Sequence, residues 1–118
     1  MALFVDNLAV GIVRMVRRES RRKRALAWKI ADGQVTRFTT SYGTRTLPLL
    51  DYTYTVSGQT EEGSATGMPI QDERINQIGD ALDELSALRI RYDPSDPSRS
   101  RLLNEDNPGL PFEVDLLG

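Results

Sequence analysis

The chain has 118 residues, 39% of them hydrophobic, which is enough for a single domain with one core. It contains no cysteine and no histidine. Disulfides, thiolate metal sites, histidine-based triads and the usual zinc ligand are therefore excluded. The absence of histidine also favours a protein that is not an enzyme, and no motif in the sequence points to a cofactor.

The net charge of −2 conceals an uneven distribution of charge. Residues 1–30 hold eight basic and two acidic side chains, whereas the remainder holds seven basic and fifteen acidic ones. A basic segment of net charge +6 thus precedes an acidic body of −8. This split predicts that the segment folds onto its own body or a second copy, or that it contacts an anionic partner such as lipid or nucleic acid.

Residues 1–27 are expected to form an amphipathic basic helix ahead of a single α+β domain over residues 28–118. At about 100° per residue, eight apolar side chains share one half of the helix: Phe4, Val5, Leu8, Ala9, Ile12, Val13, Met15 and Val16. This apolar part is about 21 Å long, which is too short to span a bilayer. It is also unlike a signal peptide, because the basic cluster follows the apolar run.

Three roles for this helix are open. It packs on its own domain or in a dimer, it lies in the plane of a membrane surface, or its run RRESRRKR binds nucleic acid. The third role is disfavoured because the run has no interleaved aromatic residues. The predicted interaction residues are Phe4, Leu8, Ile12 and Met15 on the apolar side, and Arg14, Arg17, Arg18, Arg21 and Arg22 among the basic residues.

From residue 28 the hydrophobic period changes from 3.6 toward 2. Asp32-Gly33 is interpreted as a turn that opens a first strand, and Gly43 as the tip of a hairpin. The alternation after this turn predicts that Val35 and Phe38 lie on opposite faces. The clearest strand follows, and its predicted inner face carries Leu50, Tyr52, Tyr54 and Val56.

Residues 59–67 predict a third strand, whose Gly63 and Gly67 indicate an edge, a bulge or a close approach of backbone. A helix over residues 69–88 would bury Ile75, Ile78, Leu82 and Leu85. Period 2 returns at residues 88–92, continues near residue 101, and recurs at 112–117. The order predicts an α+β fold with a mostly antiparallel, strongly twisted or barrel-like sheet of five or six strands, crossed by one helix.

The stretches Trp28, GQV at residues 33–35, YTYTVSG at 52–58 and IRYDPSDPSRSRLL at 90–103 resemble a bacterial family, domain of unknown function 3592. The resemblance covers about residues 28–103, and Lys29 departs from the proline that the family tends to have. The resemblance implies a small β-rich module. In the family this module usually lies beside transmembrane helices, which this sequence lacks. The resemblance implies no catalytic residues.

The two Asp-Pro steps in DPSDPS are interpreted as architecture. Proline cannot donate to a sheet ladder, and an aspartate before it accepts hydrogen bonds from backbone N–H groups just downstream. The alternative is a hard-cation site with Asp93 and Asp96 as ligands. The loop offers fewer oxygens than the six to eight or so that calcium takes, so the structural interpretation is preferred.

The favoured function is a non-enzymatic interaction module that self-associates, or docks to a protein or an anionic membrane surface, through residues 1–27. The expected location is the cytoplasm, peripheral at the inner face of the membrane. One alternative is a hydrolase that uses acidic residues, with or without a divalent ion. The other is non-specific nucleic-acid binding, which the acidic body disfavours.

Overall fold

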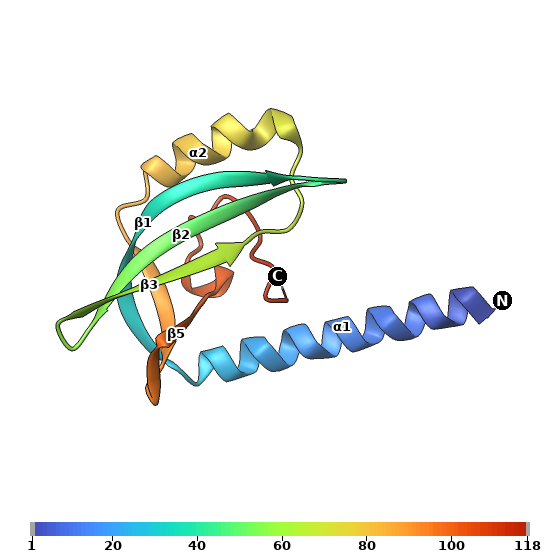
Figure 1. Cartoon of the computed structure of the whole chain (residues 1–118), viewed down its shortest axis with the longest axis horizontal. Coiled ribbons are helices and arrows are strands. Elements are labelled where there is room, and N and C mark those ends of the chain that lie inside the picture. The colour runs from blue at the N-terminus through green and yellow to red at the C-terminus, as the bar shows by residue number, and fades with distance from the viewer. Residues whose placement is uncertain (1, 118) are drawn as a thin grey trace.

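The computed structural model describes the backbone of residues 2–117 and the side chains of residues 11–117. The elements in chain order are helix α1 (Ala2–Leu26), strands β1 (Lys29–Tyr42), β2 (Thr46–Val56) and β3 (Gln59–Thr66), the 3-10 turn η1 (Asp72–Arg74), helix α2 (Ile75–Asp83), strands β4 (Leu88–Asp93) and β5 (Asp96–Leu102), and the 3-10 turn η2 (Asn104–Asp106). The five strands form one antiparallel sheet in the order β3-β2-β1-β4-β5, which curls into a nearly closed barrel (Figure 1). The predicted α+β architecture is confirmed.

The inner face of the barrel is filled by the residues that the period-2 pattern of β2 predicted. Leu50, Tyr52 and Tyr54 are all almost fully buried. Helix α2 covers one end of the barrel and adds Ile78 and Leu82 to the same core. This helix is shorter than predicted, because it ends at Asp83 and its first turn is the separate 3-10 turn η1.

The edge strands β3 and β5 approach each other where the barrel nearly closes. The Tyr52 hydroxyl lies 2.7 Å from Ser100 Oγ, and the Tyr54 hydroxyl donates to the Pro97 carbonyl at 2.6 Å. A Cβ at Gly63 would lie only 2.5 Å from Cε2 of the Tyr52 ring. The edge position indicated for this strand is confirmed, whereas the group that approaches Gly63 is a side chain and not backbone. The two tyrosine hydroxyls connect β2 to β5 across the seam.

The prediction of a turn at Asp32-Gly33 is wrong. Both residues lie inside β1, where Gly33 pairs with Tyr54 of β2 on one side and Leu88 of β4 on the other. A Cβ at Gly33 would lie 2.7 Å from the Thr53 carbonyl oxygen. The glycine is explained by this close packing of backbone in the middle of the sheet, and not by a change of chain direction.

The predicted faces of Val35 and Phe38 are also wrong. A β-bulge between Val35 and Arg37 adds one residue to β1, so the alternation shifts by one position after Thr36. Val35 and Phe38 consequently both pack against the core. A single-strand pattern could not reveal this, because a bulge is defined by the pairing with β2.

The segment after β5 is attached to the body by hydrogen bonds from asparagine side chains and not by strand pairing. Asn107 is buried, accepts a hydrogen bond from the Arg89 N–H at 2.8 Å, and donates to the carbonyls of Arg89 and Leu103, both at 2.9 Å. The strand predicted at residues 112–117 is reduced to an isolated bridge between Gly67 and Val114. This segment brings the C-terminal residues next to α1.

Candidate functional site

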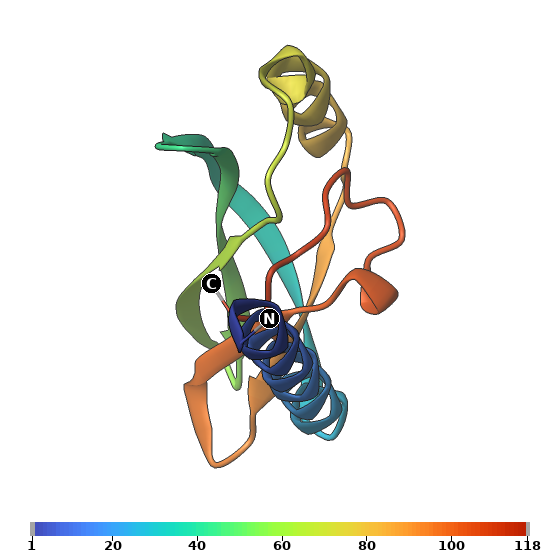
Figure 2. The same ribbon diagram turned by 90° about the vertical axis from the view of Figure 1, so that its right-hand side faces the viewer.

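Helix α1 is attached to the body at its C-terminal end and extends away from the barrel (Figures 1 and 2). Ala25 is buried, with 1% of its surface exposed. Arg91 of β4 donates to the carbonyls of Leu26 and Trp28 at 3.2 and 3.1 Å, and pairs with Asp106 at 2.8 Å. Because these contacts fix the end of the helix, they also set the direction in which the rest of it points.

Three of the predicted interaction arginines face the body. Arg21 Nη1 donates to the Leu116 carbonyl at 2.7 Å, and Arg22 Nη1 pairs with Glu105 at 2.9 Å. Arg18 Nη2 lies 3.8 Å from Met68 Sδ and 3.9 Å from Asp115. Part of the basic segment therefore folds onto its own acidic body. Sequence reasoning did not identify these partners, and the opposite charges of the two parts were the available signal.

The apolar stripe is not covered by the domain at the positions the structure describes. The exposed fractions are 54% for Ile12, 48% for Val13, 69% for Met15 and 63% for Val16. We call these four side chains the apolar patch. Packing of the stripe on its own domain, one of the predicted roles, is thus absent at residues 12–16. The predicted contact residues Phe4 and Leu8 lie outside the described side chains.

Basic side chains lie beside and just after the apolar patch. Arg14, Arg17, Lys23 and Arg24 are all exposed, and none of them makes an ion pair within residues 11–117. We call these four residues the basic flank. Helix α1 therefore carries both exposed apolar side chains and exposed cationic side chains. In the part of the chain that the structure describes, no helix is long and apolar enough to span a bilayer.

The Asp-Pro corner has the geometry of two successive Asx-turns. Asp93 Oδ1 accepts from the Ser95 backbone N–H at 2.9 Å and from its hydroxyl at 2.7 Å. Asp96 Oδ1 accepts in the same way from Ser98 at 3.3 and 2.7 Å. Each carboxylate is thus used by its own turn. Within the described residues no group of three or more acidic side chains could hold a metal ion.

These contacts predict the ionisation of Asp93. Hydrogen bonds from the Ser95 side chain and backbone, helped by Arg99 at 3.7 Å, lower the pKa of the Asp93 carboxyl. The ionised Asp93 carboxylate therefore stabilises the fold at pH values above the usual aspartate pKa. This stabilisation is lost as the pH falls through the lowered pKa of Asp93. In a carbon-detected NMR titration, Ser95→Ala should move the Asp93 midpoint upward. Equal midpoints in both proteins would contradict this assignment.

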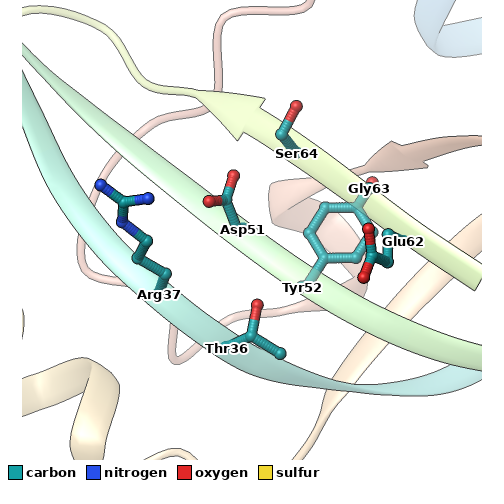
Figure 3. Close-up of a pocket in the computed structure, with 7 residues that line it drawn as sticks. All are labelled: Thr36, Arg37, Asp51, Tyr52, Glu62, Gly63 and Ser64. Atoms are coloured by element: carbon teal, nitrogen blue, oxygen red, sulfur yellow. The ribbon is translucent and has the colours of Figure 1, made fainter.

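A hollow of 570 Å³ on the outer face of the sheet is a further candidate for a site (Figure 3). It is lined by Thr36, Arg37, Asp51, Tyr52, Glu62, Gly63 and Ser64. All of these belong to the adjacent strands β1, β2 and β3, so the hollow is a depression on one sheet and not a cleft between elements. The carboxylates of Asp51 and Glu62 therefore lie in an open depression on the outer face of the sheet.

Comparison with known families agrees with this architecture. The family model described as Domain of unknown function (DUF3592) matches residues 29–107, which span all five strands and α2. The chain therefore belongs to this family, as its strand motifs indicated. No curated protein and no solved structure matches the chain.

Proposed function

We propose that this chain is a non-enzymatic module that docks on an anionic membrane surface through α1. The observation that carries the proposal is the apolar patch, four large side chains about half or more exposed on one helix. The basic flank lies on the same helix and is free of ion pairs within the described residues. Amphipathic helices with basic flanks bind bilayers in this way, with the apolar face among the acyl chains.

The free energies expected for the apolar patch and the basic flank favour reversible binding to the membrane surface. Full burial of an apolar side chain of this size contributes about 1.5–3 kcal/mol, and each basic residue near an anionic surface contributes about 1 kcal/mol. Since the patch is already partly shielded by its own helix, we expect roughly half of the apolar maximum. The two contributions are then comparable, so binding should require both anionic lipid and the apolar patch.

The orientation of the body supports the same proposal. The side of α1 that carries Ala25 and Arg18 faces the barrel, whereas Ile12 and Val16 lie more than a quarter turn away at about 100° per residue. The acidic body would therefore stay on the water side of the docked helix. This avoids repulsion between its net charge of −8 and anionic headgroups.

The test is flotation with vesicles of phosphatidylcholine alone or mixed with phosphatidylglycerol. We expect the protein to float with the anionic vesicles, and the double variant Ile12→Glu/Val16→Glu to lose at least about tenfold in retention, because two charges must enter the apolar layer. The matched control is Ile30→Glu, which changes an isoleucine of β1 with 43% exposure outside the helix. Equal retention of the double variant and the unchanged protein would contradict the proposal.

A second copy of the chain is the competing partner for the apolar patch. Light scattering without lipid separates the two. A dimeric mass that the Ile12→Glu/Val16→Glu variant converts to a monomeric one would assign the patch to self-association. The hydrolase and nucleic-acid alternatives are not proposed, because the outer hollow is open and Arg18 and Arg22 already contact carboxylates of the body.

A further inference from the structure

Two arginines that are neighbours in the β4–β5 ladder have very different surroundings. Arg91 and Arg101 are paired in register. Arg91 forms two hydrogen bonds to the Asp106 carboxylate, at 2.8 and 2.9 Å. Arg101 is partly buried, yet within residues 11–117 it makes no ion pair and no side-chain hydrogen bond. A partly desolvated guanidinium without a carboxylate is a costly arrangement that an anion would relieve.

Further cations lie near Arg101. Burial lowers the pKa of Arg101, and repulsion from Arg21 of α1 and Arg99 of β5 adds to the effect. Arg21 uses Nη1 on the Leu116 carbonyl. The Arg99 guanidinium lies 5.9 Å from the centre of the Trp28 ring and 3.7 Å from the Asp93 carboxylate. Three guanidinium groups from two elements are thus gathered where α1 passes β5.

A small hollow opens beside this cluster. It has a volume of 70 Å³ and lies between β3, β5 and the C-terminal segment, with Arg101, Ser64 and Ser100 among its lining residues. Asp115 also lines it, but this carboxylate lies 3.9 Å from Arg18. The local balance of charge therefore remains positive. The Ser100 hydroxyl already contacts the Tyr52 hydroxyl, so Ser64 is the serine that offers an additional donor.

We propose that Arg21 and Arg101, with Arg99 at the rim, bind a phosphate group where α1 meets β5. A guanidinium donates two parallel N–H bonds to phosphate oxygens, and this geometry is available both in a free phosphate and in the singly charged phosphodiester of a lipid headgroup. The phosphate could belong to a lipid headgroup or to a free phosphate. The lipid source rests on the proposed function, whereas the free anion does not.

The test follows the Nε–Hε resonances of the arginines by NMR while inorganic phosphate is added to the full chain. At matched ionic strength with chloride, the unchanged protein should show a saturable shift at Arg101 and Arg21. Arg101→Gln and Arg21→Gln should each weaken binding about tenfold, the loss of one charge-assisted pair. Arg45→Gln, in the β1–β2 turn, is the matched control and should bind as the unchanged protein does.

Two further measurements keep the proposal falsifiable. Arg101→Lys preserves the charge and should still weaken binding, since lysine cannot make the paired contact. The proposed site would be contradicted if the resonances of all variants shifted linearly and by equal amounts with chloride and with phosphate. Flotation of Arg101→Gln identifies the source of the bound phosphate. Reduced retention on phosphatidylglycerol vesicles indicates the lipid headgroup. Unchanged retention together with lost phosphate binding indicates the free anion. Failure of the Ile12→Glu/Val16→Glu test would leave the phosphate titration unaffected.

Discussion

Replacing Tyr52 by alanine is expected to destabilise the protein by about 3–5 kcal/mol, the cost of removing a large buried aromatic side chain. Tyr52 is 1% exposed, its ring lies over Gly63, and its hydroxyl reaches Ser100 on the opposite edge of the sheet. The substitution therefore removes core volume and a link across the barrel seam together. Urea unfolding followed by circular dichroism measures the loss.

Tyr52→Phe separates these two contributions. It keeps the ring and removes the hydroxyl, so the expected cost is about 1 kcal/mol, the net value of one hydrogen bond. Burial also raises the pKa of the Tyr52 phenol. The free energy of unfolding should therefore be highest at pH values below the usual tyrosine pKa and should fall as the pH rises through the raised pKa of Tyr52. The fall should be less steep in Tyr52→Phe. A Tyr52→Ala protein as stable as Tyr52→Phe would show that the ring does not pack as described.

Asn107→Ala is expected to cost about 3 kcal/mol. The amide of Asn107 satisfies the Arg89 N–H and the carbonyls of Arg89 and Leu103, and each buried group left without a partner costs about 1–3 kcal/mol. Because water has partial access to the loop, we expect the loss of stability to be near the lower end of the summed cost of these groups. The same unfolding measurement tests this value.

Two variants bracket the Asn107 result. Asn76→Ala, on the exposed face of α2, should change stability by less than about 0.5 kcal/mol. Asn107→Asp keeps an acceptor for the Arg89 N–H but directs a carboxylate at two carbonyls, so it should be destabilising at neutral pH and partly restored in acid. An Asn107→Ala protein with unchanged stability would mean that the loop after β5 does not depend on this side chain.

Much of the fold could be predicted because its signals are local. The alternation of Leu50, Tyr52 and Tyr54 identifies the buried face of β2, and the spacing of Ile78 and Leu82 identifies the buried face of α2. The Asp-Pro corner was equally accessible, since an Asx-turn involves residues two apart. These features depend on near neighbours in the chain, so a single sequence contains them.

The errors arose where the deciding contact is distant in sequence. Gly33 was interpreted as a turn residue because no local pattern reveals the Thr53 carbonyl and the Ile90 side chain against it. The bulge at Thr36 is visible only against β2, and the buried role of Asn107 only against β4. For the candidate site, the amphipathic character of α1 was predictable, whereas the partners Glu105, Asp115 and Leu116 lie more than 80 residues away.

The sequence by itself determined that α1 has an apolar side and a basic side, since both follow from the helical period. Only the tertiary structure decided which of these groups are free. The contacts of Ala25, Arg21 and Arg22 turn one side of the helix toward the body and leave Ile12, Val16, Arg17 and Arg24 in solvent. The reason is physical: exposure depends on which surfaces the folded body places beside the helix, and those surfaces come from strands and loops far along the chain.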